Sequence, residues 1–287
     1  MNQSGNTDPS FALRVLQSPL TRLLLLGGVL FSMMAESNGL RERLASSRVD
    51  MITVSIAMGA LAFMVYTAFV RLVERREPSE LALAPMPREW SIGALIGAGL
   101  YTLCVLILMT LGIYRVEGLN PASFLLTAIA MAISTGIFEE LVFRGVLFRI
   151  LEEVLGSWIA LAASSLVFGF IHLLNPAGTV TGALFISIEA GLLLGAAYML
   201  TRRLWISIGF HMAWNYTQSG IFSGVVSGGV ADPGLIKAAI SGPALLTGGS
   251  FGLESSLIAF VLCTATGVTM LVMAKRRGHV IPPVWRR

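Results

Sequence analysis

Three short stretches of this sequence place ionisable residues inside otherwise apolar segments. The stretches are EELVFR, FGFIH and HMAWN, and their polar residues are Glu139, Glu140, Arg144, His172, His211 and Asn215. The one other histidine, His279, lies in a basic C-terminal tail. Carboxylates and imidazoles carry out general acid–base chemistry, and ionisable groups in hydrocarbon are costly enough to indicate a functional site.

The spacing within EELVFR divides its charges. Glu140 and Arg144 are four residues apart, so they share a helix face and can form an ion pair along it. Glu139 points about 100° away around the helix and has no partner on its own helix. A free carboxylate in an apolar pocket suits general-base work on a water molecule. The alternative is a purely structural ion cluster between helices.

His211 and Asn215 are also four residues apart and share a helix face. A histidine beside an asparagine can orient a carbonyl group or stabilise an oxyanion, and the alternative is an interhelical hydrogen bond. Glu189 lies in a further apolar segment. We interpret it as structural, paired with a histidine across the bundle or with Arg144.

The elements that position these residues must be membrane helices. Of 287 residues, 55% are hydrophobic and only 13% are charged, whereas soluble domains carry about 25% charged residues. This composition excludes a disordered chain and a disulfide scaffold, and it makes a soluble globular protein a poor fit. The net charge of +4 is better explained by orientation in a membrane than by nucleic-acid binding. Cys104 and Cys263 lie in apolar runs and are expected to be apolar core or lipid-facing residues.

The predicted fold is an all-α, multi-pass bundle of about eight transmembrane helices. The predicted segments are 19–35, 51–73, 91–114, 123–151, 157–174, 180–200, 204–222 and 251–274. The mixture of charges, prolines and leucines in residues 74–90 predicts a segment at the membrane interface, either irregular or a short amphipathic helix. The Gly-rich stretch 219–252 predicts a loop that packs against the bundle and is partly re-entrant. We divide the chain into N-terminal spans (1–120), a core (121–222), and a Gly-rich loop, last span and basic tail (223–287).

The positive charges predict the orientation. With eight spans both termini share one side, and that side carries all but five of the 20 Lys and Arg residues. The five on the other side are Arg41, Arg43, Arg48, Arg115 and Lys237. An excess of this kind marks the cytoplasmic side. We therefore expect both termini in the cytoplasm, with the protein in a plasma membrane.

The positions of Glu139 and His172 along their predicted helices place both side chains at a similar depth in the membrane. Glu139 lies 17 residues before Gly156 and His172 lies 16 residues after it. If the chain turns there, two antiparallel helices bring these side chains to a similar level. His211, only 8 residues after Arg203, is expected roughly 10 Å nearer the cytoplasm if the turns are level.

Taken in order, the three stretches resemble the motifs E-E-x-x-x-R, F-x-x-x-H and H-x-x-x-N of the CPBP family, the CAAX-prenyl and bacteriocin-processing (Abi) membrane proteases. The resemblance covers roughly residues 120–220, and the stretch TGGSFGLE (residues 247–254) also looks like bacterial members. It implies an intramembrane endopeptidase in which Glu139 is the general base and His172 binds or polarises the water. His211 and Asn215 would form the oxyanion site, with Glu140 and Arg144 as supporting residues.

The resemblance does not decide whether the site uses a metal ion. Glu139, His172 and His211 would be the ligands of a zinc ion, but the spacing H-E-x-x-H is absent. We favour a metal-free, glutamate-activated water and commit to no cofactor. The expected partners are the lipid bilayer and a membrane-associated peptide or protein, and no nucleic acid.

Other protease chemistries fit less well. The aspartates are Asp8, Asp50 and Asp232, none of them in mid-span, which excludes an intramembrane aspartyl protease. The absence of H-E-x-x-H excludes a site-2-type zinc protease, and the absence of G-x-S-G argues against a rhomboid-like serine protease. The alternative from another class is a transporter, or an immunity or binding scaffold, that keeps the polar cluster for structure.

Overall fold

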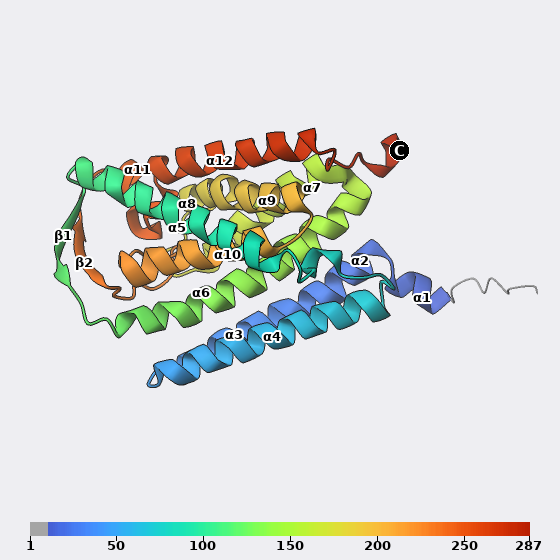
Figure 1. Ribbon diagram of the computed structural model, residues 1–287, viewed down its shortest axis with the longest axis horizontal. Coiled ribbons are helices and arrows are strands. Elements are labelled where there is room, and N and C mark those ends of the chain that lie inside the picture. Colours follow the sequence, from blue (N-terminus) through green and yellow to red (C-terminus); the bar gives the residue numbers. More distant parts are fainter. Residues whose placement is uncertain (1–10) are drawn as a thin grey trace, which may run out of the picture.

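A computed structural model describes residues 11–287 as a helical bundle with a small two-stranded sheet at one end (Figure 1). In chain order the helices and strands are α1 (Phe11–Leu16), α2 (Pro19–Arg22), α3 (Gly28–Arg43), α4 (Arg48–Leu72), α5 (Met86–Thr110), β1 (Tyr114–Leu119), α6 (Phe124–Glu140), α7 (Arg149–Ile171), α8 (Val180–Ile186), α9 (Leu193–Thr201), α10 (Trp205–Asn215), β2 (Ile236–Ile240), α11 (Ala244–Thr247) and α12 (Leu257–Arg276). Wider π-helical segments extend or connect several of these helices: Leu23–Gly27, Leu141–Phe148, Ser187–Leu192 and Tyr216–Ile221.

The multi-pass membrane bundle is confirmed. Within residues 11–287, six continuous helical stretches are long and apolar enough to cross a membrane: Pro19–Arg43, Arg48–Leu72, Met86–Thr110, Phe124–Leu174, Val180–Thr201 and Leu257–Arg276. The fourth is 51 residues long and changes direction at Gly156. All eight predicted segments contain a helix, and the seventh is the shorter helix formed by α10 and its π-helical extension.

The turn at Gly156 sets the level of the two helices on either side of it. Gly156 has φ +74°, and a Cβ there would lie 2.6 Å from the backbone nitrogen of Pro283. The C-terminal tail covers this turn, because Ser157 donates its amide to Ile281 O at 2.9 Å. The hairpin places the ring of Phe143 against that of Phe168, with centroids 5.0 Å apart.

Two helices approach closely through glycine. Cβ atoms added at Gly93 and Gly97 of α5 would lie 2.1 and 2.4 Å from the carbonyl oxygens of Ile206 and Phe210 on α10. Small residues allow membrane helices to approach backbone to backbone. The α5–α10 contact therefore fixes the helix that carries His211.

Several boundaries differ from the sequence prediction. The last helix begins at Leu257 and not at residue 251, because Gly252 (φ +113°) breaks the chain direction and Ser256 caps the helix by accepting from Ala259 N. In the predicted interfacial segment 74–90, residues 74–85 contain a single 3₁₀ turn, Ser79–Leu81, and residues 86–90 already belong to α5, which begins at Met86. The antiparallel pair of β1 and β2, with Tyr114 opposite Ile240, was not predicted at all.

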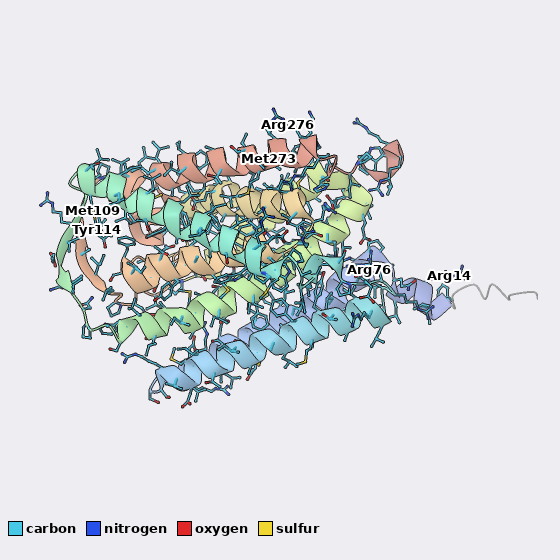
Figure 2. The ribbon with its side chains drawn as sticks, in the orientation of Figure 1. Arg14, Arg76, Met109, Tyr114, Met273 and Arg276 are labelled. Atoms are coloured by element: carbon cyan, nitrogen blue, oxygen red, sulfur yellow. The ribbon has the colours of Figure 1, made fainter. Side chains whose placement is uncertain are left out.

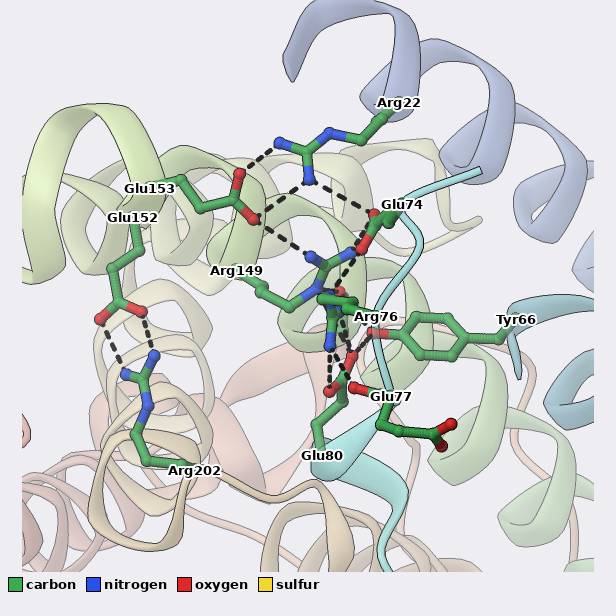
Figure 3. Close-up of polar contacts among 11 residues, drawn as sticks. Arg22, Tyr66, Glu74, Arg76, Glu77, Glu80, Arg149, Glu152, Glu153 and Arg202 are labelled. Carbon is green, nitrogen blue, oxygen red and sulfur yellow. Dashed lines mark hydrogen bonds and ion pairs between the residues drawn. The ribbon is translucent and has the colours of Figure 1, made fainter. Parts of the chain in front are cut away.

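Charged residues gather at the end of the bundle opposite the strands. In Figure 2, Arg76 and Arg276 lie toward the end where the C-terminus is found, while Met109 and Tyr114 lie at the strand end. Figure 3 shows the ion pairs there: Arg149 contacts Glu74 at 2.7 Å, and Arg202 contacts Glu152 at 2.5 Å. This asymmetry follows the charge distribution from which we predicted the cytoplasmic side.

Candidate active site

Glu140 lies at the centre of a buried polar network. Its side chain is fully buried, and Oε1 accepts from Arg144 Nη1 at 2.8 Å and from His211 Nδ1 at 2.8 Å. The predicted i,i+4 pair therefore forms, and it reaches a second helix through the histidine. A carboxylate that accepts from both groups lowers the cost of keeping the arginine in the bundle interior.

Arg144 is held from three sides. Besides Glu140, its Nη2 donates to the carbonyl oxygens of Ala190 and Gly191 at 3.1 and 3.2 Å. The guanidinium carbon lies 4.5 Å from the centroid of the Phe168 ring, within the range of a cation–π contact. Arg144 thus joins three helical segments: its own, the α8–α9 region and α7.

Glu139 points into a cavity and is not part of the Arg144 ion pair. Its side chain is 15% exposed, and its Oε2 is buried without a hydrogen-bond partner among the described residues. The cavity, which we call the Glu139 cavity, has a volume of about 200 Å³. It is lined by Phe31, Met34, Asn38, Ser134, Thr135, Glu139, Phe143, Ile171, His172, Leu174 and Asn175.

His172 lines the same cavity from the opposite side of the hairpin. Its Nδ1 lies 2.7 Å from Phe168 O, which can only accept, so Nδ1 carries the proton. In the neutral ring Nε2 is then an acceptor. The expectation that Glu139 and His172 lie at a similar depth is confirmed, because both side chains line one cavity.

His211 lies between the two glutamates. Its Nδ1 faces Glu140, and its Nε2 lies 3.8 Å from Glu139 Oε2. The His211 and Glu139 side chains therefore lie at one level, and the offset of His211 expected for level turns is absent. Since Nδ1 must donate to the Glu140 carboxylate, Nε2 can donate only when the ring is an imidazolium.

Asn215 lies one turn after His211, but it does not line the Glu139 cavity. Its Nδ2 donates to Thr135 Oγ1 at 3.0 Å, and Thr135 does line that cavity. Asn215 itself borders a separate enclosed cavity of about 20 Å³, together with His211, Glu189 and Glu254. Its role in binding an oxyanion stays a prediction.

The predicted partner of Glu189 was wrong. Among residues 11–287, Glu189 forms no ion pair with Arg144 or a histidine within 4 Å, and its Oε2 has no hydrogen-bond partner. The reason is that Arg144 donates to backbone carbonyls of the segment containing Glu189 and not to its side chain. Glu189 instead faces Glu254 in the small cavity.

Glu254 is a polar residue of this region that the sequence analysis did not single out. It is 2% exposed, and burial raises the pKa of its carboxyl group. The available signals were a glutamate in a glycine-rich, apolar stretch and the likeness of that stretch, TGGSFGLE, to bacterial members of the family. Cys104 and Cys263 are buried, as expected for apolar core residues, and neither forms a disulfide within residues 11–287.

The residues proposed as possible zinc ligands do not form a metal centre. Within residues 11–287, no group of three or more His, Cys, Asp or Glu side chains is arranged to hold a metal ion. The hydrogen bonds of His172 and His211 direct one ring nitrogen of each to Phe168 O and to Glu140.

Comparison with known families agrees with this geometry. The family model described as "Type II CAAX prenyl endopeptidase Rce1-like" matches residues 121–217. This match covers about a third of the chain and supports the resemblance to the CPBP/CAAX proteases. No curated protein and no solved structure matches the chain.

The matched region contains all six motif residues, from Glu139 to Asn215. It does not contain α3, which supplies Phe31, Met34 and Asn38 to the wall of the Glu139 cavity. The cavity is therefore completed by a part of the chain outside the matched region.

Proposed function

We propose that the protein is an intramembrane endopeptidase that hydrolyses peptide bonds of membrane-associated substrates with a water activated by Glu139. The observation that carries this proposal is the pairing of an unpartnered carboxylate oxygen with a free imidazole nitrogen in one cavity. Glu139 and His172 supply these atoms from the two arms of the Gly156 hairpin. The helices around them are apolar enough to lie in a membrane.

Glu139 and His172 would act together on the water. The water would donate to the free Glu139 oxygen and to Nε2 of His172, which orients a lone pair toward the scissile carbonyl carbon. Glu139 takes the proton as the carbon–oxygen bond forms. It then gives this proton to the leaving amine as the carbon–nitrogen bond breaks.

His211 would stabilise the negative charge that develops on the carbonyl oxygen. Its Nε2 can donate only as an imidazolium, and Glu140 is placed to stabilise that form through the 2.8 Å contact at Nδ1. Asn215, fixed to α6 through Thr135, would support the same oxygen. Glu140 and Arg144 are positioning residues, since Glu140 holds the His211 ring at Nδ1 and Arg144 in turn holds Glu140.

We propose the substrate class from the matching family. The matching family is described as a CAAX prenyl endopeptidase, so a lipid-modified or apolar peptide held at the membrane is the first substrate to test, and bacteriocin-type peptides are the second. The cluster of arginines at the end opposite the strands supports an orientation with both termini in the cytoplasm of a plasma-membrane protein.

The test is cleavage of a farnesylated peptide panel by the purified protein, its Glu139→Gln variant and a control, Glu36→Gln. Glu36 is exposed on α3 and does not line the Glu139 cavity. Loss of a general base typically lowers the rate by about 10²- to 10⁴-fold. We expect that loss for Glu139→Gln and parental activity for Glu36→Gln. Metal analysis of active protein, and a chelator in the assay, separate this mechanism from a zinc-dependent one.

A further inference from the structure

We propose that the small cavity bordered by His211 and Asn215 binds one sodium ion between the carboxylates of Glu189 and Glu254. Glu189 is not one of the six motif residues, and Glu254 lies outside the matched region 121–217. The cation site goes beyond the peptidase proposal, because a bound ion can be measured without any substrate.

The first support is a pair of buried negative charges without compensation. Glu189 and Glu254 are each 2% exposed. Neither forms an ion pair within residues 11–287, and one oxygen of each, Glu189 Oε2 and Glu254 Oε1, is buried without a hydrogen-bond partner. The nearby cations are already engaged, because Arg144 and His211 both donate to Glu140. Buried charges need a partner, and intramembrane carboxyl groups often mark ion sites.

The second support is the space between these two carboxyl groups. Both side chains line the small cavity, whose volume is about 20 Å³. A cavity of this size has room for about one water-sized particle. A water molecule there would leave both negative charges uncompensated, whereas a cation of similar size offsets them.

Neutral oxygen ligands are also at hand. Asn215 lines the cavity, and its amide oxygen is left as an acceptor because Nδ2 donates to Thr135. Ser227 lines the cavity from the Gly-rich loop and adds a hydroxyl group. Gln218 is fully buried, its Oε1 has no hydrogen-bond partner among residues 11–287, and it lies close enough to hydrogen-bond to Glu254.

The surroundings of Glu254 show what the cation would supply. Burial raises the pKa of Glu254 and so works against its charge, whereas hydrogen bonds from Ser227 and Gln218 work in favour of it. Trp214 acts in the same sense as these two residues, and its indole N–H can only donate. A cation beside the unpartnered oxygen would complete the compensation of a charge that three donors already favour.

The ligands and the space favour sodium over other cations. Carboxylate, amide and hydroxyl oxygens are hard ligands, which suit alkali and alkaline-earth ions rather than zinc or copper. Calcium takes six to eight oxygen ligands, and magnesium usually keeps several of its waters. A cavity of about 20 Å³ has no room for such a shell, so a small monovalent ion is the best match.

A sodium ion at this place would join three segments that are distant in the sequence. Glu189 lies in the π-helical segment Ser187–Leu192, Asn215 ends α10, and Glu254 lies in the 3₁₀ turn Leu253–Ser255 that precedes α12. Binding to the folded protein alone raises its stability. The ion should therefore raise the melting temperature.

The experiment measures melting and ion binding of the full-length protein in detergent micelles at constant ionic strength. Choline chloride is replaced stepwise by NaCl or by KCl, and binding of ²²Na⁺ is followed by a scintillation proximity assay. The variants are Glu189→Gln, Glu254→Gln and Ser227→Ala, and the control is Glu36→Gln, at an exposed position on α3. Melting curves in choline chloride establish that each variant is folded.

We expect NaCl to raise the melting temperature of the parent in a saturable way, by about 3–6 °C at ten times the dissociation constant. KCl should raise it less, and about one ²²Na⁺ should bind per protein. Both glutamine variants should lose the shift and the binding, Ser227→Ala should bind ²²Na⁺ several-fold more weakly, and Glu36→Gln should behave like the parent.

Three results would overturn the proposal. The first is equal shifts with NaCl and KCl, which would indicate a general salt effect. The second is ²²Na⁺ binding that is unchanged in the cavity variants. The third is a parent that neither binds ²²Na⁺ nor responds to NaCl, which would indicate that the two carboxyl groups hold protons instead. Neither readout uses a substrate, so the outcome is independent of peptidase activity.

Discussion

Replacing Glu140 with Gln should lower the free energy of unfolding of the protein, whereas replacing the adjacent Glu139 with Gln should leave it unchanged. Glu140→Gln removes a buried carboxylate that faces both Arg144 and His211. Glu139→Gln removes a carboxylate whose one ion-pair partner among residues 11–287 is His211 at 3.8 Å. Glu140 and Arg144 side chains are 0% and 2% exposed. We therefore expect the first variant to lose stability and the second to keep it.

The magnitude follows from the charge that is left behind. Breaking a buried ion pair by removing one partner costs about 3–5 kcal/mol. For Glu140→Gln the loss of unfolding free energy should lie at the lower end of this range, about 3 kcal/mol. The reason is that Arg144 keeps two carbonyl acceptors and the Phe168 ring. A glutamine at position 140 can still accept one hydrogen bond, which limits the loss further.

The assay measures the free energy of unfolding in mixed detergent micelles. It compares the parent, both single variants and the double variant Glu140→Gln/Arg144→Met. The double variant removes both charges and should recover part of the loss. A Glu140→Gln variant as stable as the parent would refute the reasoning. So would a double variant that is no more stable than Glu140→Gln alone.

Two further predictions concern the hairpin turn and the charged end. Gly156→Ala should lower the melting temperature, because residue 156 has φ +74° and the new Cβ would meet Pro283 N at 2.6 Å; the same change at Gly28, where nothing lies within 4 Å, is the control. At Glu80, burial acts to raise the pKa, but hydrogen bonds from Arg76 and Tyr66 and the nearby arginine charges outweigh it and hold the pKa below its usual range. The stability that Glu80 contributes is therefore complete above the unfolded pKa of about 4.3 and is lost as the pH falls through the lower folded pKa. Unfolding measured from pH 7 downward should show a flatter profile in Glu80→Gln, and identical profiles would contradict this.

The parts of the site that could be predicted from the sequence depend on local geometry. The i,i+4 spacing of Glu140 and Arg144 is enough to predict their ion pair. The nearly equal numbers of residues between Gly156 and each of Glu139 and His172 are enough to place these two side chains at one level. Helical periodicity and a single turn carry both inferences. The apolar segments likewise predict the helices, because length and composition decide which segments can span a membrane.

The parts that could not be predicted depend on contacts between distant segments. Arg144 donates to the carbonyls of Ala190 and Gly191 because a π-helical segment widens the backbone there. Glu254 reaches the small cavity through a glycine-rich loop. Spacing within one helix carries no information about such contacts.

Spacing within one helix is equally uninformative about the β-sheet and about the outer wall of the Glu139 cavity. The short strands β1 and β2 pair residues more than a hundred positions apart, across a bulge between Val116 and Gly118. The wall of the Glu139 cavity includes Asn38 from α3, which no motif marks. In each case the partner lies far away in the sequence, and only the packing of whole helices brings it close.

The central claim is that Glu139 activates the water that cleaves the peptide. The most direct test is cleavage in ¹⁸O-labelled water by folded parent and Glu139→Gln protein, with the new carboxyl group analysed by mass spectrometry. The account predicts one ¹⁸O atom in the product of the parent and a loss of about 10²- to 10⁴-fold in rate for the variant. Cleavage by Glu139→Gln at the parental rate would contradict it.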